Sequence, residues 1–311
     1  MRALVTGADG FVGLHLCAEL EARGVEVVAG ARPLDGMRGD VPIELGDCEQ
    51  LRRVIREIQV DVVYHLAAQA FVPRATADPL ETYETNILGT ARLVEAIRLL
   101  PEGTRPRLLF TSSGEVYGAH ARAELPIGEG ALPMPATPYA ASKLAGEAIV
   151  LSSAKTYGFP AVVTRSFNHI GPGQSDRFVV AGFARRLAAI AAGGNPLFPV
   201  GDLSTQRDFL DVRDAVRAYA DLGERGVDGE LYNVCSGVPT RIQDILRQLV
   251  MAARAGVEIR EDPALMRPAD VPVIYGDNRK LKAATGWEPR FTLARSLRDV
   301  YEDARAATAT A

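Results

Sequence analysis

Three glycines stand where the first apolar run of the chain gives way to a helical stretch. Gly7, Gly10 and Gly13 follow the run 2–6 and surround the start of a helix expected from Phe11. In such a turn the first glycine permits a tight bend, the second lets a pyrophosphate approach the backbone, and the third allows the helix to pack closely. The helix N-terminus adds unpaired N–H groups and a partial positive charge. This placement predicts a dinucleotide site at the first turn of a parallel sheet.

Short apolar runs alternate with helical stretches along the first half of the chain. The runs that we interpret as strands lie at 2–6, 25–29, 60–66, 108–112 and 161–165. Each run is apolar throughout instead of alternating with polar residues, as expected when helices cover both faces of a parallel sheet. The pattern therefore predicts an α/β fold with a doubly wound parallel sheet.

The alternating pattern loosens after Asn168, where segments rich in glycine and proline follow. A helix is expected at 212–222, a strand at 230–234 and a terminal helix from Leu293. We therefore predict a dinucleotide-binding domain of residues 1–168 and 205–236, with a smaller, discontinuous C-terminal substrate lobe of residues 169–204 and 237–311.

Composition narrows the possible partners. The 311 residues include 35 basic and 39 acidic side chains, a formal net charge of −4. We expect no nucleic-acid partner, because such proteins collect phosphates with a broad positive surface. Cys17, Cys48 and Cys235 stand far apart, with no pair at metal-ligand spacing, which indicates a reducing compartment and no metal. The sequence shows neither a leader pattern nor an apolar run of roughly 18 residues, so we expect a cytoplasmic protein without membrane association.

The end of the second expected strand bears on which dinucleotide binds. An acidic residue there would accept hydrogen bonds from the adenosine ribose, whereas a cation would favour a 2′-phosphate. Arg32 stands two residues after Gly30, and no acid occupies the strand end. We therefore predict NADPH or NADP over NAD, with Arg32 on the 2′-phosphate, although a surface arginine beside a turn is the alternative. Asp47 could accept from the adenine amino group or cap a helix.

A tyrosine and a lysine stand one helical turn apart in the segment PYAASK. Tyr139 and Lys143 therefore emerge on the same helix face, where an ammonium would favour the phenolate and lower the tyrosine pKa from about 10. Ser113 and Glu115 directly follow the fourth expected strand, at the carboxyl edge where ligands of parallel sheets bind. We interpret Tyr139 as an acid or base and Ser113 as a group that polarises a substrate oxygen.

Together these motifs resemble the extended short-chain dehydrogenases/reductases that act on nucleotide sugars. The resemblance covers nearly the whole chain and includes the glycine triplet, the strand end His65-Leu66-Ala67-Ala68, Asn86 with Gly89-Thr90, and the Ser113, Tyr139 and Lys143 set. It implies a Rossmann-type fold in which the serine and tyrosine contact the reacting sugar oxygen and the lysine binds the nicotinamide ribose. The cofactor residues that we expect are Gly7, Gly10, Phe11, Val12, Gly13, Arg32, Asp47, Cys48, Leu66, Ala67, Ala68, Asn86, Tyr139 and Lys143.

Later arginines would supply the other half of the cleft. Arg165, Arg207 and Arg267 lie in three separate segments, and the planar guanidinium suits a diphosphate because it donates in pairs and stays charged. Taken alone, each of these arginines is more typical of a surface ion-pair partner. The resemblance implies phosphate contacts for Arg207 and Arg267, and substrate contacts for Ser113 and Asn168.

Within the family, the amino-acid sequences of these segments are most similar to those of reductases that convert GDP-4-dehydro-6-deoxy-D-mannose to GDP-D-rhamnose. That likeness implies NADPH-dependent reduction of the C4 ketone of a GDP-sugar, with Tyr139 as proton donor. Relatives are often dimers, and the helical segments 87–100 and 139–157 are suitable for such packing.

Three other functions stay open. Glu115 stands where sister 4,6-dehydratases keep a glutamate that abstracts a sugar proton, which favours a GDP-mannose 4,6-dehydratase. Those enzymes place Asp or Ser before that glutamate, whereas Gly114 stands here. A nucleotide-sugar 4-epimerase is another enzyme of this kind. A noncatalytic NADP(H)-sensing protein is the third alternative, and the complete Ser113, Tyr139 and Lys143 set argues against it.

Overall fold

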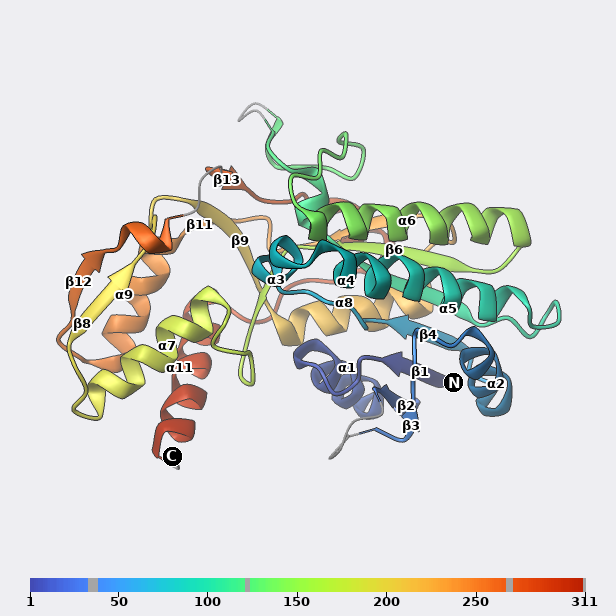
Figure 1. The fold of residues 1–311 in the computed structure, drawn as a ribbon, viewed down its shortest axis with the longest axis horizontal. Helices are drawn as coiled ribbons and strands as arrows, with labels where there is room; N and C mark the ends of the chain where they lie inside the picture. Colours follow the sequence, from blue (N-terminus) through green and yellow to red (C-terminus); the bar gives the residue numbers. More distant parts are fainter. Residues whose placement is uncertain (33–38, 121–123, 267–270, 310–311) are drawn as a thin grey trace.

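A seven-stranded parallel sheet forms the larger part of the molecule (Figure 1). The computed structural model describes residues 1–32, 39–120, 124–266 and 271–309. The strand order is β10-β6-β5-β4-β1-β2-β3. Their bounds are β1 (Arg2–Thr6), β2 (Glu26–Ala31), β3 (Val41–Pro42), β4 (Val62–His65), β5 (Arg107–Ser113), β6 (Ala161–Ser166) and β10 (Leu231–Val234). The predicted Rossmann-type α/β class is confirmed, and the five predicted runs all form strands of this sheet.

Helices cover both faces of the sheet. In β1, Ala3 and Val5 pack in one core while Leu4 packs in the other, because successive strand residues point to opposite faces. Helices α1, α8 and α10 supply the first core, and α2, α5 and α6 supply the second. The helices of this part are α1 (Phe11–Ala22), α2 (Cys48–Ile58), α3 (Val72–Ala77), α4 (Pro79–Tyr83), the π-helix η1 (Glu84–Leu88), α5 (Gly89–Arg98), the 3₁₀-helix η2 (Gly114–Tyr117), α6 (Pro138–Tyr157), α8 (Val212–Arg225) and α10 (Arg279–Thr285).

A smaller lobe lies at one end of the large sheet, at the left in Figure 1. Its core is formed largely by α7, α9 and α11 together with β8 and β9. Strand β9 pairs with β7, β11 and β13, while β8 pairs with β12. The elements are β7 (Asn168–Ile170), α7 (Val179–Ala191), β8 (Leu197–Val200), β9 (Gln206–Asp211), β11 (Pro239–Arg241), α9 (Ile242–Ala253), β12 (Glu258–Glu261), the 3₁₀-helix η4 (Pro263–Leu265), β13 (Val273–Ile274) and α11 (Leu293–Ala309).

The chain leaves the large sheet after β6, returns as its edge strand β10, and leaves again. Strand β9 is hydrogen-bonded in the small sheet, whereas α8 and β10 pack in the large one. The division into two domains at the predicted boundaries stays a prediction. No helix among the described residues is long and apolar enough to cross a membrane.

Candidate active site

The three glycines differ in what surrounds them. Gly7 has a φ of +72°, a left-handed conformation that glycine adopts without strain. A Cβ on Gly13 would lie 2.1 Å from the Gly7 carbonyl oxygen, so α1 packs against the turn more closely than any side chain allows. Gly10 is the N-cap of α1 and supplies no side chain to the N–H groups of the first turn. These features fit a pyrophosphate at the helix N-terminus.

The ends of β1, β2 and β4 meet beside this turn. Thr6 pairs with Gly30 of β2 and with His65 of β4. Arg32 is exposed just beyond the end of β2, at the same edge of the sheet. Asp47 is the N-cap of α2, and its carboxylate accepts a hydrogen bond of 2.9 Å from the Gln50 N–H. Cys48 is the first residue of that helix. Contacts of these three side chains with a cofactor stay predictions.

Beneath the turn, a buried histidine joins β1, β4 and α5. His65 Nε2 lies 3.1 Å from the Thr90 hydroxyl, which itself donates to the Asn86 carbonyl, so the ring nitrogen is the donor. Nδ1 therefore accepts from the Thr6 hydroxyl at 2.8 Å. Burial, with a smaller contribution from the Lys143 ammonium, lowers the His65 pKa to about 3. The imidazole is therefore neutral, and its two hydrogen bonds connect Thr6 of β1 to Thr90 of α5.

The segment after β4 lies against the glycine turn. A Cβ on Gly7 would come within 3.0 Å of the Ala67 backbone, and the Ala67 N–H donates to Thr6 Oγ1 at 3.3 Å. Leu66 and Ala68 flank Ala67 in this segment. Asn86 is buried, and its amide nitrogen donates to the Gln69 carbonyl at 3.0 Å and to Ser142 Oγ at 2.9 Å. The asparagine thus fastens this segment to α6, and direct contact of Asn86 with a cofactor stays a prediction.

Helix α6 brings its tyrosine to the end of β5. Thr137 caps the helix by accepting from the Ala140 N–H, and Pro138 at its first position has the φ that a helix start requires. The Tyr139 hydroxyl is hydrogen-bonded to Ser113, whose Oγ also accepts from the Glu115 N–H at 3.2 Å. The structure therefore brings together the predicted serine and tyrosine at the carboxyl edge of the sheet.

The expected lowering of the tyrosine pKa is corrected by the structure. Burial raises the pKa of Tyr139 above 10, the negative charge of Glu115 raises it further, and the Ser113 hydrogen bond opposes them only in part. Lys143 is 4% exposed, and its Nζ lies 5.0 Å from the centre of the Phe110 ring. Burial lowers the pKa of this lysine to about 8, against the raising effect of Glu147. The sequence prediction considered only the spacing of Tyr139 and Lys143 by one helical turn. In the structure, the loss of hydration on burial has a larger effect on the pKa of each residue.

The predicted arginines have different surroundings. Arg165 is buried and forms a two-pronged ion pair with Glu147, so it follows the ion-pair alternative, although it lies in the interior and not on the surface. Arg207 is partly exposed on β9, where it pairs with Ile274 of β13. Asn168 is exposed on β7, and its amide donates to the Asp208 carbonyl at 3.0 Å. Arg267 lies outside the described residues.

Asp208 is an organising residue that the sequence analysis did not single out. It is fully buried, and its carboxylate accepts from the N–H and hydroxyl of Ser236, from the Gly237 N–H and from the Gly276 N–H, at 2.7 to 3.3 Å. Burial raises its pKa, while these four donors oppose the rise. Its position between Arg207 and Phe209 was the available signal, but the donors come from segments about 30 and 70 residues away.

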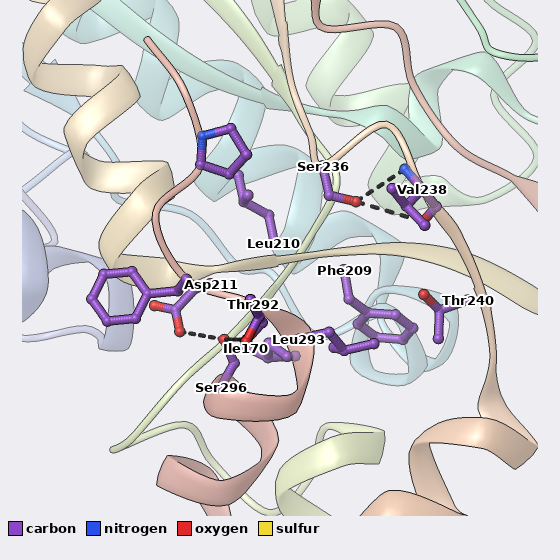
Figure 2. A pocket seen from close by; sticks show the side chains of 12 residues that line it. Ile170, Phe209, Leu210, Asp211, Ser236, Val238, Thr240, Thr292, Leu293 and Ser296 are labelled. Carbon is purple, nitrogen blue, oxygen red and sulfur yellow. Dashed lines mark hydrogen bonds between the residues drawn. The ribbon is translucent and has the colours of Figure 1, made fainter.

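A cavity of about 230 Å³ lies in the smaller lobe (Figure 2). Phe209, Val238 and Leu293 contribute apolar walls, and the Ser296 hydroxyl donates to Asp211 at one side. None of its lining residues is among those predicted to bind cofactor or substrate. Among the described residues, no three His, Cys, Asp or Glu side chains cluster as metal ligands.

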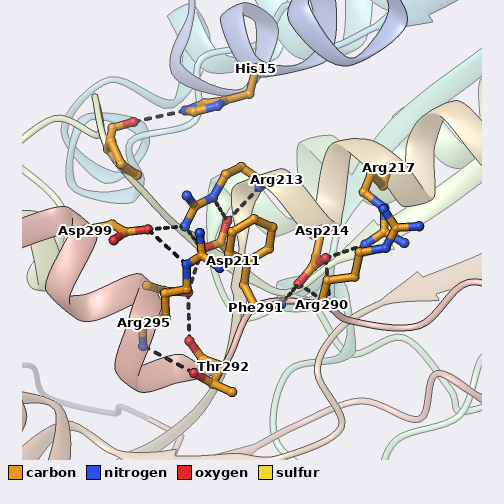
Figure 3. Close-up of polar contacts among 12 residues, drawn as sticks. His15, Asp211, Arg213, Asp214, Arg217, Arg290, Phe291, Thr292, Arg295 and Asp299 are labelled. Atoms are coloured by element: carbon orange, nitrogen blue, oxygen red, sulfur yellow. Dashed lines mark hydrogen bonds and ion pairs between the residues drawn. The ribbon is translucent and has the colours of Figure 1, made fainter. Parts of the chain in front are cut away.

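A charged cluster fastens the terminal helix to the start of α8 (Figure 3). Arg213 donates to Asp211 and to Asp299 of α11, both at 2.7 Å, while its guanidinium carbon lies 3.8 Å from the Phe291 ring centre. Near this cluster in Figure 3, His15 of α1 is hydrogen-bonded to the Pro172 carbonyl at 3.0 Å. These contacts attach the smaller lobe to the two helices on one face of the large sheet.

The parallel sheet, the glycine turn and the Ser113, Tyr139 and Lys143 set define an extended short-chain dehydrogenase/reductase. Residues 4–300 match the family described as GDP-mannose 4,6 dehydratase, and the chain belongs to this family. It is an NAD(P)-dependent nucleotide-sugar oxidoreductase. The resemblance drawn from the sequence is confirmed.

Individual relatives show which members of the family the chain is similar to. The chain is 42% identical to a GDP-6-deoxy-D-mannose reductase of Pseudomonas aeruginosa, over 97% of this chain and 96% of the relative. It is also similar to the structure of RMD from Pseudomonas aeruginosa complexed with NADPH, with a TM-score of 0.87, 40% identity, and coverage of 98% and 99% of the two chains. A UDP-glucose 4-epimerase of Thermus thermophilus in complex with NAD has a TM-score of 0.86 and 32% identity, with coverage of 99% and 100%.

Proposed function

We propose that the protein uses NADPH to reduce the C4 ketone of GDP-4-dehydro-6-deoxy-D-mannose, forming GDP-D-rhamnose. The similarity to a GDP-6-deoxy-D-mannose reductase, which extends over nearly the full length of both chains, supports this substrate class. The hydrogen bond between Ser113 and Tyr139 at the carboxyl edge of the sheet is the observation that carries the chemistry.

The protonation state of Tyr139 suits reduction of a ketone. Because its pKa is raised, the phenol carries its proton at neutral pH and has one to donate to the developing C4 alkoxide. The Ser113 hydroxyl donates a second hydrogen bond to the same oxygen. Bound NADPH supplies the hydride. The Lys143 ammonium holds the nicotinamide ribose and stabilises the phenolate that remains after proton transfer.

Two features support NADPH as the cofactor. Exposed Arg32 at the end of β2 offers a cation for the 2′-phosphate, and a similar solved structure holds NADPH. The glycine turn would hold the pyrophosphate through the N–H groups at the start of α1. On the substrate side, Arg207 of β9 would contact the diphosphate and Asn168 of β7 the sugar. Both roles rest on the family resemblance.

Product analysis with purified protein tests the function. We expect NADPH consumption with GDP-4-dehydro-6-deoxy-D-mannose and a product with the C4 configuration of GDP-D-rhamnose. Tyr139→Phe removes the proton donor and should lower kcat by about 10² to 10⁴-fold while leaving the Kd for NADPH nearly unchanged. Wild-type protein that binds NADPH but reduces no 4-keto sugar would contradict the proposal and favour a sensor.

A dehydratase is the second candidate, because the Glu115 charge acts on the Tyr139 hydroxyl. The packing around the preceding residue opposes it. A Cβ on Gly114 would meet the Phe167 ring at 3.0 to 3.1 Å, so no larger side chain fits before the glutamate unless the ring moves. Incubation with GDP-mannose and no added reductant separates the two candidates, since only a dehydratase would release the 4-keto sugar.

The homodimer that the family resemblance implies would use helices α5 and α6. Leu88, Leu99 and Tyr157 are 45%, 38% and 44% exposed around these helices, which leaves apolar surface for a second copy. Light scattering coupled to gel filtration would give a mass of about twice 33.4 kDa for a dimer. Charged substitution of Leu88 should then return the protein to the mass of a single chain.

A further inference from the structure

Three interacting charged side chains of α6 and β6 are buried. Lys143, Glu147 and Arg165 are 4%, 3% and 5% exposed. Arg165 donates to both carboxylate oxygens of Glu147, from Nε at 2.9 Å and from Nη2 at 2.7 Å. Such a pair needs this geometry, because each ion loses several kcal/mol of hydration on burial. Two cations and one anion therefore share a region with little access to water.

The helix geometry relates this pair to the lysine. Glu147 follows Lys143 by four residues in α6, so both side chains emerge on one face of the helix. The carboxylate raises the pKa of Lys143 and opposes the effect of burial. Arg165 comes from β6, and its guanidinium carbon lies 4.6 Å from the Tyr117 ring centre, which fixes the arginine from its other side.

The other groups near the lysine do not supply a compensating charge. The Lys143 charge acts on His65 of β4, whose pKa burial lowers to about 3, so this imidazole is neutral at physiological pH. Phe110 of β5 offers only the face of its ring, 5.0 Å from Nζ. Tyr139 carries its proton, and Glu115 acts on that tyrosine from the end of β5. Among the described residues, Glu147 is the anion whose charge acts on Lys143.

We propose that Glu147 is a positioning residue, clamped by Arg165, that keeps the Lys143 ammonium charged and in place for catalysis. The proposal deepens the proposed function, in which a cationic lysine holds the nicotinamide ribose and stabilises the tyrosine phenolate. Without the carboxylate, Lys143 and Arg165 would be two buried like charges, and the lysine would lose its proton more readily. Arg165 in turn holds the Glu147 carboxylate, so that Glu147 does not pair directly with Lys143. Such a direct pair would draw the lysine away from the cofactor.

Opposite effects of two substitutions separate this role from simple support of the fold. Glu147→Gln leaves two cations and should lower the Lys143 pKa by about one unit or more, whereas Arg165→Met leaves one cation and one anion and should raise it. The double variant Glu147→Gln with Arg165→Met restores a single cation and should bring the pKa close to that of the wild type. Removal of both partners leaves neither Glu147 nor Arg165 buried without its partner, so the double variant should fold where a single one does not.

The lysine content of the chain makes the direct measurement practical. Its lysines are Lys143, Lys155, Lys280 and Lys282. Spectra of protein with ¹³Cε-labelled lysine give one signal for each, and Lys143→Arg identifies the buried one. We expect its titration midpoint to fall in Glu147→Gln, to rise in Arg165→Met, and to return in the double variant. Shifts in the same direction in both single variants, or no shift in either, would overturn the proposal.

A functional readout accompanies the titration. In Glu147→Gln the affinity for NADPH should decline at a lower pH than in the wild type, because the ribose contact is lost once the lysine is neutral. The double variant should recover the wild-type pH profile. An unchanged pH dependence of the NADPH Kd despite a shifted lysine titration would refute the link to the cofactor. Both measurements need no sugar substrate, so they fail or succeed independently of the proposed reduction.

Discussion

Substitution of Gly13 by alanine gives two opposite expectations. Gly13 lies in the first turn of α1, and alanine is favoured over glycine in a helix by about 1 kcal/mol. In the structure, however, the new Cβ would lie 2.1 Å from the Gly7 oxygen, 2.7 Å from Ala8 Cα and 2.9 Å from the Ala8 carbonyl carbon. All three are backbone atoms, so no side-chain rotation can relieve the contacts.

The size of the effect follows from the movement required. Relief of the contacts requires α1 to move away from β1 by about 1 Å, against Leu16 and Leu20 in the core. Overpacking of this kind costs about 1 to 3 kcal/mol, and the upper end applies because all three contacts are with backbone atoms. After the helix preference is subtracted, we expect the free energy of unfolding to fall by about 2 kcal/mol.

Urea unfolding of the cofactor-free protein, followed by circular dichroism, measures this change. Two matched variants serve as controls. Gly256→Ala meets no atom within 4 Å and should leave the midpoint unchanged. Gly10→Ala meets only the Gly7 oxygen at 3.2 Å, so it should reduce NADPH affinity with little loss of stability. A Gly13→Ala protein as stable as the wild type would refute the close-packing argument.

Further predictions concern other parts of the site. Asp208→Asn preserves the side-chain shape but places an NH₂ group, in exchange for an acceptor oxygen, among N–H donors. The free energy of unfolding should therefore fall by about 2 to 4 kcal/mol in urea unfolding. An unchanged midpoint would show that the carboxylate is not required. Arg32→Ala should weaken NADPH binding at least about tenfold, since a charge-assisted phosphate contact is worth about 1.5 to 3 kcal/mol. In fluorescence titrations NADH binding should stay unchanged. Equal losses for both cofactors would contradict the 2′-phosphate contact. Because the pKa of His65 is lowered to about 3, the unfolded chain binds a proton at this histidine at a higher pH than the folded protein does. Stability should therefore fall as pH decreases from about 6.5 towards 3, by about 1.4 kcal/mol per pH unit. His65→Gln should reduce that slope in urea midpoints measured across this range, and a slope equal to that of the wild type would contradict the assignment.

Much of the fold could be predicted because its signals are local. The run 2–6, the glycines and the helix start at Phe11 depend on neighbours in the chain, and the structure has β1 at Arg2–Thr6 and α1 from Phe11. The place of Ser113 at the carboxyl edge of the sheet could also be inferred, because the parallel strands end there, whereas its pairing with Tyr139 was implied by the family resemblance. Product identity beyond the nucleotide-sugar class rests on resemblance, because sugar recognition depends on loop geometry.

The sequence by itself determined the strand and helix order, the glycine turn and the placement of Tyr139 one turn before Lys143, since these follow from backbone sterics and helical periodicity. Only the tertiary structure decided the charge states, because desolvation depends on what packs around a group. Burial raised the Tyr139 pKa where sequence spacing predicted a lowering, and the fold paired Arg165 with Glu147, a partner that the sequence did not identify. The electrostatics of a buried site depend on atoms that are distant in the chain, and no local pattern encodes their distances.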